Sequence, residues 1–385
     1  MAPFDFATAG RIVFGRGTAL GAADLVLDLG RRVLVVTGAT SARAAWLVGA
    51  LEAKGADCRL LSICNEPDVA FVSRSAEYAR TRGFDVVVAT GGGSALDAGK
   101  AIAALTTSPG DPLDYLEVVG RGHALQTVPL PFVAIPTTAG TGSEVTRNAV
   151  LSVPGRRVKV SLRSPLMLPR LAIVDPGLTD DLPSAVTAST GLDALTQLIE
   201  PFLSTRATPV TDAFCRAGIP LVARSLRRAY RYGHDLAARE DMALASLFGG
   251  MALANAGLGA VHGLAAPIGG MFAAPHGAVC AALVPHVFRA NLQAIRALGP
   301  AHPARPRLDE IARLVTGRVD ATADDAADWL LETCRDLGIA PLSRYGISEA
   351  SVAEIVAQAG QTSSMKGNPV PLTGSELAEA LRAAM

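Results

Sequence analysis

Short apolar runs in the first half of the chain constrain the fold most strongly. Each run has six to ten residues. Segments with helix-like apolar spacing separate the runs in this chain of 385 residues. The runs are RVLVVTG (32–38), CRLLSI (58–63), FDVVVATGGG (84–93), PFVAIPTT (131–138) and LAIVDP (171–176). Nearly continuous Val, Ile and Leu indicate strands that are buried on both faces. Their alternation with helical segments predicts a doubly wound parallel sheet, an α/β fold.

The second half of the chain has a different pattern. After DPGLTDDLP (175–183), strand-like runs disappear, and Ala- and Leu-rich segments with helical periodicity continue nearly to Met385. The length of the chain also favours two domains. We therefore predict an α/β domain of residues 1–178 and an all-helical domain of residues 179–385.

Composition limits the class of partner and the compartment. The 35 basic residues balance 35 acidic ones, so neither nucleic acid nor an anionic membrane is expected as a partner. Apolar runs are broken before the roughly 18 residues that a membrane span needs. MAPFDFATAGRIVFG has no signal-peptide pattern, and the five cysteines are scattered without C-x-x-C spacing. A cytoplasmic protein with reduced thiols, most of them small core residues, is expected.

A glycine-rich turn follows the third apolar run. Gly91, Gly92, Gly93 and Ser94 separate a buried strand from a helix that passes through Asp97. Glycines allow close approach of a pyrophosphate, and a helix N-terminus offers N–H groups to it. The sequence is neither G-x-G-x-x-G nor a P-loop. The alternative is a tight strand-to-helix turn without a ligand.

A second loop, PTTAGTGSEVTRN (136–148), follows the next strand. Its hydroxyl groups could bind a polar ligand without filling a crevice; they belong to Thr137, Thr138, Thr141 and Ser143. Two such loops at neighbouring strand ends predict a bound nucleotide. A polar surface turn is the alternative.

A candidate metal site is split between two regions. In GLDALTQLIE (191–200), Asp193 and Gln197 are four residues apart and share one helix face. His262 and His276 are fourteen residues apart in one glycine-rich segment. Together the four side chains could surround one divalent ion and leave a position for a substrate oxygen. Ordinary helix packing is the alternative for the first pair. The other histidines, for which no such role is expected, are His123, His234, His286 and His302.

Together, GGGSALDAGK, PTTAGTGSEVT, AIVDPGLT, GLDALTQLIE and the segment with His262 and His276 resemble the iron-containing (group III) alcohol dehydrogenase family. The likeness runs in order from about residue 10 to Asn368-Pro369. It implies a dinucleotide-binding α/β domain, a helical domain, and an active site with its metal in the cleft. It also implies NAD or NADP, a divalent metal such as Fe²⁺ or Zn²⁺, a small alcohol or aldehyde substrate, and a homodimer.

The resemblance also assigns residues. It places Gly92, Gly93, Ser94 and Asp97 at the pyrophosphate, with Thr137, Thr138, Thr141 and Ser143 around the nicotinamide half of the cofactor and Lys159 beside it. It makes Asp193, His262 and His276 catalytic metal ligands, puts Gln197 at the fourth ligand position, and lines the substrate pocket with Asn148, Leu253 and Leu258.

Three positions depart from the family pattern. Gln197 stands where the family usually has a ligand histidine, and a neutral amide oxygen should weaken Fe²⁺ or Zn²⁺ binding without abolishing it. Ala266 stands where many members have a histidine that helps proton transfer. Gly38 follows VLVVT, where NAD-selective members often have aspartate, and Thr40, Ser41 and Arg43 come next. NADP is therefore permitted and slightly favoured.

The leading hypothesis is a metal-assisted NAD(P)-dependent alcohol dehydrogenase or aldehyde reductase. One rival is a metal-independent reductase similar to the maleylacetate reductases, which depart from the usual ligand set. Another is a non-catalytic nucleotide-binding or assembly protein. Decay of GGGS or of both histidines would mark the last class, and neither has occurred.

Overall fold

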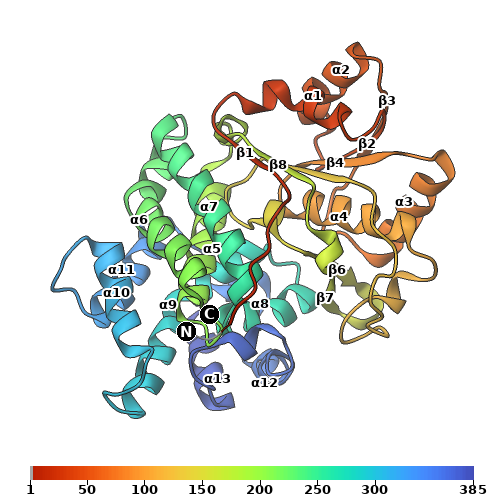
Figure 1. Ribbon diagram of the computed structural model, residues 1–385. Coiled ribbons are helices and arrows are strands. Elements are labelled where there is room, and N and C mark those ends of the chain that lie inside the picture. The colour runs from red at the N-terminus through yellow and green to blue at the C-terminus, as the bar shows by residue number, and fades with distance from the viewer. Residues whose placement is uncertain (1–2) are drawn as a thin grey trace. The chain divides into compact units, whose positions relative to one another are not determined.

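The computed structural model describes residues 3–385, so Met1 and Ala2 of the segment examined for a signal peptide lie outside it (Figure 1). The chain forms two compact units. The α/β unit contains residues 8–138 and 142–179, and the helical unit contains residues 3–7, 139–141 and 180–385. The predicted boundary after residue 178 stays a prediction.

A six-stranded parallel sheet organises the α/β unit, with strand order β1-β8-β5-β4-β2-β3. The strands are β1 (Ile12–Phe14), β2 (Arg32–Thr37), β3 (Asp57–Ser62), β4 (Val86–Gly91), β5 (Phe132–Pro136) and β8 (Leu171–Val174). All five predicted runs form strands of this sheet, and β1 adds a three-residue edge strand. With the helical second half described below, this confirms the predicted fold class.

Both faces of the sheet are covered, which explains the uninterrupted apolar runs. Along β2, Val33 and Val35 pack in one core with helices α1 (Ala22–Leu27) and α2 (Ala45–Ala53). Leu34 and Val36 point to the other core, which contains α3 (Val69–Arg82) and α4 (Gly93–Thr107). Figure 1 shows the two helix pairs on opposite sides of β2 and β4. The inner residues of β2 and β4 are therefore apolar on both faces, whereas the edge strand β3 is partly exposed.

A two-stranded antiparallel hairpin, which we did not predict, supplements the main sheet. Its strands are β6 (Asn148–Val153) and β7 (Val158–Arg163). Residues of β6 alternate between buried and partly exposed, as expected of a strand with only one face in the core. The hairpin packs against α4 and so extends the core on that side of the sheet.

The helical unit surrounds the long helix α5. Its helices are α5 (Ser184–Leu203), α6 (Pro209–Arg231), α7 (Leu236–Ala256), α8 (Ala260–Met271), α9 (His276–Ala297), α10 (Arg305–Thr316), α11 (Ala323–Asp336), α12 (Glu349–Ala359) and α13 (Gly374–Ala383). Helices α6, α7 and α9 pack against α5. Glycine allows a close crossing there, since a Cβ on Gly191 would lie 2.3 Å from Leu226 Cδ1 of α6. Helix α5 is consequently buried on almost every side from Gly191 to Leu203.

Helix α9 corrects one expectation from the sequence, namely that every apolar run is too short to span a membrane. By length and composition alone, α9 could cross a membrane, with a mean hydropathy of 1.3. In the structure, however, 67% of that apolar stretch is buried. Helices α7 and α8 pass the same test as a pair, but they meet at a bend of 96°. The buried share of α9 is the pattern of a core helix.

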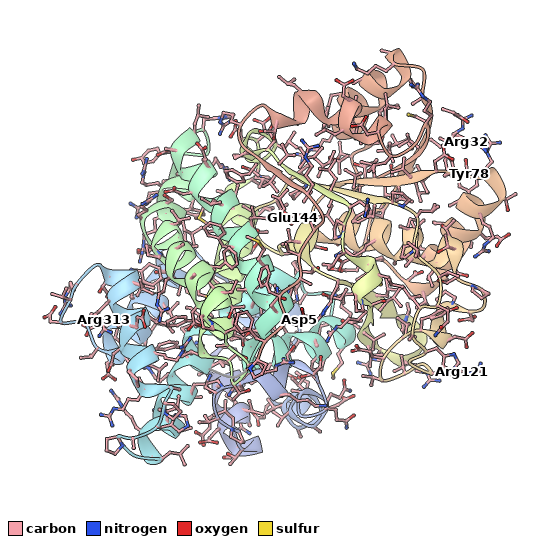
Figure 2. All side chains as sticks on the ribbon, viewed as in Figure 1. Asp5, Arg32, Tyr78, Arg121, Glu144 and Arg313 are labelled. Atoms are coloured by element: carbon pink, nitrogen blue, oxygen red, sulfur yellow. The ribbon has the colours of Figure 1, made fainter. Side chains whose placement is uncertain are left out.

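Charged side chains are mostly exposed, with a few informative exceptions. Arg32, Arg121 and Arg313, which Figure 2 labels, are exposed, whereas Glu144 in the same view is only 2% exposed. Lys100 is 1% exposed, which is rare for a lysine. Such burial marks both groups as parts of a specific polar network.

Candidate metal centre and dinucleotide site

The glycine turn joins β4 directly to α4. Gly92 is the N-cap of α4 and has no side chain to cap the first turn. A Cβ on Gly91 would lie only 2.7 Å from the Ala95 Cβ, so a larger residue there would displace the helix. The first N–H groups of α4 are thus left for an external acceptor, the arrangement that binds anions at helix N-termini. Gly93 and Ser94 lie in that first turn and are partly exposed.

The turn lies where the strand order reverses. Strands β2 and β4 are neighbours, but the chain visits the edge strand β3 between them. At their carboxyl ends, a Cβ built on Gly91 would be 3.4 Å from the backbone nitrogen of Gly38. Ligands of open α/β sheets bind at such a switch point. The structure therefore brings Gly38 and the glycine turn together, as the nucleotide hypothesis requires.

The loop after β5 lies beside the same turn. The Thr137 N–H donates to the Gly91 carbonyl at 2.9 Å. A Cβ on Gly92 would be 3.4 Å from Thr138 Cγ2, so these two residues are in contact range. Thr141 belongs to the helical unit with Ala139 and Gly140. Two residues of the predicted hydroxyl set, Thr137 and Thr138, therefore lie beside the glycine turn.

Asp97 and Ser143 contact each other rather than lying separately. The Ser143 hydroxyl donates to Asp97 Oδ1 at 2.6 Å, and the Val150 N–H donates to Asp97 Oδ2 at 2.9 Å. Both carboxylate oxygens thereby hold the segment that leads into β6. This arrangement assigns Asp97 a positioning contact within the chain, and its direct contact with pyrophosphate stays a prediction.

Lys100 supports the same segment from one turn further along α4. Its Nζ donates to the Ser143 carbonyl at 2.7 Å, the Thr146 hydroxyl at 2.9 Å and the Asn148 carbonyl at 2.9 Å. Burial lowers its pKa to about 8, although nearby Asp97 and Glu144 act in the opposite direction. Burial likewise raises the pKa of Glu144 to about 7. Sequence reasoning missed this role, although a lysine inside the apolar helix GKAIAAL was a visible signal.

The remaining cofactor and substrate residues are more scattered. Lys159 in β7 is 3.4 Å from Glu66 Oε1, and its side chain is largely buried. Asn148 begins β6 in the α/β unit, whereas Leu253 lies in α7 and Leu258 follows it in the helical unit. All three of these last residues are partly buried. Their grouping into one substrate pocket, and the cofactor role of Lys159, stay predictions.

The predicted metal ligands converge within the helical unit. Asp193 and Gln197 lie on α5, His262 in the first turn of α8, and His276 at the start of α9. Asp193 Oδ1 is 3.4 Å from His262 Nε2 and 3.8 Å from His276 Nε2. The two imidazole rings are 5.3 Å apart between centroids. Cys280, one turn after His276 on α9, joins the same group of ligand atoms.

Three atoms of this group are buried and unsatisfied. Among the described residues, Asp193 Oδ1, Gln197 Oε1 and His262 Nε2 have no hydrogen-bond partner. A buried polar atom without a partner costs about 1–3 kcal/mol, and more when it is charged. Asp193 Oδ1 and His262 Nε2 are 3.4 Å apart and can each donate an electron pair to one divalent cation, and Gln197 Oε1, one turn further along α5, is a third donor atom. The residues present therefore fit a metal ion.

Glu200 fixes the orientation of His262. Its Oε2 is 2.6 Å from His262 Nδ1, and its Oε1 accepts the Val261 N–H at 2.7 Å. When His262 is neutral, as metal binding requires, a proton held on Nδ1 leaves the Nε2 lone pair facing Asp193, which is how outer carboxylates orient metal-binding histidines. Sequence reasoning missed Glu200. The signal was its spacing, since it lies seven residues after Asp193 and hence on the same face of α5.

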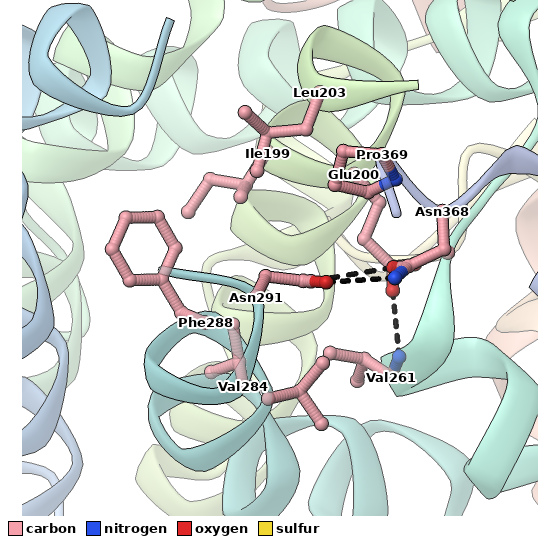
Figure 3. Close-up of a pocket in the computed structure, with 11 residues that line it drawn as sticks. Ile199, Glu200, Leu203, Val261, Val284, Phe288, Asn291, Asn368 and Pro369 are labelled. Atoms are coloured by element: carbon pink, nitrogen blue, oxygen red, sulfur yellow. Dashed lines mark hydrogen bonds between the residues drawn. The ribbon is translucent and has the colours of Figure 1, made fainter. Parts of the chain in front are cut away.

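Asn368 also holds the beginning of α8, and Figure 3 shows its hydrogen bonds with Asn291. Its Oδ1 accepts the Ala260 N–H at 3.1 Å, and its Nδ2 donates to Asn291 Oδ1 at 2.7 Å. Gly259 leaves room for this arrangement, because a Cβ there would be 2.9 Å from Glu200 Oε1. Glu200, Asn291 and Asn368 line a cavity of about 10 Å³ beside the ligand cluster. That volume holds about one water molecule.

The charges of the cluster are coupled. Burial raises the pKa of Asp193, but the charges of His276 and His262 outweigh it, so the pKa is lowered overall. Burial lowers the pKa of His262, yet Cys280 and Glu200 raise it well above the ordinary value. Asp193 therefore stays a carboxylate. It and Glu200 place negative charges beside the His262 imidazole.

Two family models match the chain, one in each half. Residues 9–176 match the model of the family described as iron-containing alcohol dehydrogenase. Residues 187–385 match the model described as the Fe-containing alcohol dehydrogenase family, C-terminal. Both matches confirm the resemblance predicted from the motifs.

Individual proteins agree with the family match. Alcohol dehydrogenase 4 of Saccharomyces cerevisiae is 42% identical over 246 residues, which make up 64% of this chain and 62% of the yeast protein. The crystal structure of a 1,3-propanediol oxidoreductase superposes with a TM-score of 0.90 at 32% identity and covers 100% of both chains. Sulfoacetaldehyde reductase from Bifidobacterium kashiwanohense, solved in complex with NAD⁺, has a TM-score of 0.86 at 29% identity and covers 100% of this chain and 99% of its own. The two solved structures thus match the fold of this chain over its whole length.

Proposed function

Because this chain belongs to the iron-containing alcohol dehydrogenase family, we propose that it is an NAD(P)-dependent alcohol dehydrogenase or aldehyde reductase. It transfers hydride between the nicotinamide and a small alcohol or carbonyl compound with the help of a divalent metal. The observation that carries the proposal is the cluster of Asp193, His262 and His276, in which Asp193 Oδ1 and His262 Nε2 are buried without a hydrogen-bond partner. A bound ion would remove the cost of leaving these two atoms buried and unbonded.

Asp193, His262 and His276 would hold the metal, and Gln197 would contribute an amide oxygen. Bound there, the ion supplies Lewis-acid chemistry that polarises a carbonyl oxygen. The Asp193 carboxylate would place a negative charge beside the ion. Its 1% exposure keeps bulk water from screening that charge. Glu200 keeps the His262 lone pair directed toward Asp193.

No histidine side chain is available for proton transfer at residue 266. Ala266 lies four residues after His262 on α8 and so on the same face. We propose that the proton leaves through water, the cofactor ribose or a hydroxyl such as that of Thr141. Ala266→His should then change the pH dependence of kcat/KM, and an unchanged profile would place control of the relay elsewhere.

NADP is slightly favoured over NAD. Gly38 follows β2 directly and provides no carboxylate to repel a 2′-phosphate. Arg43 is exposed in the turn Ser41–Ala44 just beyond it, where its guanidinium could bind a phosphate. Arg43→Gln should weaken NADPH binding about tenfold and leave NADH binding unchanged. Equal effects on both cofactors would remove this preference.

We also propose roles for the two parts of the chain, the identity of the ion and the form of the protein. Residues 1–178 would bind the cofactor, and residues 179–385 would hold the metal and the substrate. Fe²⁺ or Zn²⁺ would be the ion. A cytoplasmic homodimer without nucleic-acid or membrane partners is the expected form.

A metal-independent reductase, similar to the maleylacetate reductases, is the second candidate because Gln197 occupies a ligand position. NAD(P)H oxidation with a panel of small aldehydes distinguishes the two. The assay is repeated after chelation and after addition of Fe²⁺, Zn²⁺ or Mn²⁺. Loss of activity on chelation and recovery with metal would support the proposal. Full activity in protein shown by elemental analysis to contain no metal would favour the second candidate.

A further inference from the structure

We propose that the thiolate of Cys280 is a ligand of the metal centre and compensates for the weak donor Gln197. The inference rests on the proposed function in assuming that a metal binds here. It differs from the sequence analysis, which expected most of the cysteines to be small core residues. It also changes the expected metal preference.

Cys280 lies at the right place on the right helix. It is four residues after His276 on α9, so the two side chains share one face. Cys280 Sγ is 3.6 Å from His276 Nε2, and Cys280 is fully buried. One ligand atom from each of Asp193, His262, His276 and Cys280 lies within 4.8 Å of the other three.

The separations agree with those expected around a single ion. With Zn–N and Zn–O near 2.1 Å and Zn–S near 2.3 Å, a tetrahedron has N···O edges of roughly 3.4 Å and N···S edges of roughly 3.6 Å. The N···O separations from Asp193 to His262 and His276 are 3.4 Å and 3.8 Å. The N···S separation from His276 to Cys280 is 3.6 Å. These four atoms therefore fit one ion, and the Gln197 amide or a substrate oxygen would take a fifth position, to which catalytic zinc sites can expand.

A simple hydrogen bond between Cys280 and His276 is the competing explanation. It accounts for the 3.6 Å contact, since sulfur hydrogen bonds have similar lengths. It leaves Asp193 Oδ1 and His262 Nε2, which are 3.4 Å apart, buried without a hydrogen-bond partner beside that contact, however. A shared ion satisfies both atoms together with the sulfur, so it explains more of the cluster.

Charge balance also favours a thiolate. Asp193 with two neutral imidazoles and an amide offers one negative charge to a divalent ion in a buried site. A thiolate raises the ligand charge to two and neutralises the ion, which reduces the cost of burying it. The thiol proton is released to solvent when the metal binds. A soft sulfur ligand shifts preference toward Zn²⁺ and away from Mn²⁺ and Fe²⁺.

Another buried cysteine provides a matched control. Cys334 lies on α11, where its Sγ donates to the Ala281 carbonyl at 3.3 Å. Burial raises the pKa of the Cys334 thiol, and Cys334 is not part of the ligand group. Cys334→Ala therefore removes a buried thiol of the helical core without touching the proposed metal site.

The test is a titration of metal-free protein with Co²⁺, followed by absorption. The wild type and Cys334→Ala should bind one equivalent and develop a near-ultraviolet sulfur-to-cobalt charge-transfer band. Cys280→Ala should lack this band and bind Zn²⁺ at least about tenfold more weakly, because loss of even an outer partner of a ligand has an effect of that size. The double variant Cys280→Ala/Gln197→His should regain affinity without regaining the band.

Each contrary result has a distinct meaning. Binding of one Co²⁺ by the wild type without a charge-transfer band would overturn the role of Cys280 and leave the proposed function standing. Failure of the folded wild type to bind Co²⁺ would overturn both. X-ray absorption of the Zn²⁺-loaded wild type does not depend on any variant folding. It should show one sulfur at about 2.3 Å from zinc, and a shell of nitrogen and oxygen alone would refute the inference.

Discussion

Replacing Glu200 by glutamine should weaken metal binding while the fold is retained. In the structure, Glu200 accepts from two partners at once, with distances of 2.6 Å to His262 Nδ1 and 2.7 Å to the Val261 nitrogen. Glutamine has one oxygen for these two positions, and its NH₂ group must face the other. If the NH₂ group faces His262, it donates to Nδ1 and moves the imidazole proton to Nε2.

The size of the effect follows from the difference between the two orientations. In the metal-free protein the NH₂ group can face His262, with the imidazole proton on Nε2 and the Val261 N–H still bonded. Metal binding needs the Nε2 lone pair, so the glutamine oxygen must turn to the Nδ1 proton, and only in the bound state does the buried Val261 N–H lose its acceptor, at a cost of about 1–3 kcal/mol. Since 1.4 kcal/mol is tenfold in a dissociation constant, we expect the Kd for Zn²⁺ to rise about 10–100-fold.

Competition with a chromophoric chelator measures this Kd directly. Glu354→Gln is the matched control because Glu354 is an exposed residue of α12 whose carboxylate accepts from Gln358. The control should bind Zn²⁺ as the wild type does. Thermal unfolding of the metal-free proteins checks that Glu200→Gln is folded. A Zn²⁺ Kd within twofold of the wild type in folded Glu200→Gln would refute the role assigned to Glu200.

Three further substitutions test other parts of the structure. Gln197→His should tighten Zn²⁺ binding about tenfold or more in chelator competition, since imidazole is a better donor than an amide, and an unchanged Kd would place Gln197 outside the coordination shell. Lys100→Met should lower the free energy of unfolding in urea by about 3 kcal/mol or more, because buried acceptors lose their donor, whereas exposed Lys54→Met should change it by less than about 1 kcal/mol. The raised pKa of Glu144, about 7, means that the folded state keeps a proton which the unfolded state releases above about pH 4.5. Stability should therefore fall between pH 5 and pH 7, and Glu144→Gln should remove up to about 3 kcal/mol of that fall; an identical pH dependence in the variant would contradict this reasoning.

The sheet was predictable because both of its faces are buried. Such strands give uninterrupted apolar runs, and all five runs found in the sequence are strands. Strand β1 has only three residues, too few to produce a pattern. The hairpin β6–β7 was missed because one face of β6 is partly exposed and Asn148 begins the strand among polar residues. Half-buried short strands are defined by their neighbours more than by their own sequence.

The candidate site was predictable where residue type carries the chemistry. Asp193, His262 and His276 are metal-ligand types in recognisable motifs, and the structure brings them together. Glu200 and Cys280 gain their importance from tertiary proximity. Their helical spacing from Asp193 and His276 is a signal only once the opposing helices are known. A glutamate and a cysteine on apolar helices look like ordinary residues otherwise.

The central claim is that a divalent metal binds within the helical unit among Asp193, His262 and His276. Anomalous diffraction at the zinc edge, from crystals of the Zn²⁺-loaded protein, tests it most directly. We predict one strong anomalous peak within about 2.0–2.2 Å of Asp193 Oδ1 and His262 Nε2, with His276 completing its contacts. A peak at another place, or no peak in protein that retains cofactor-dependent activity, would contradict the claim.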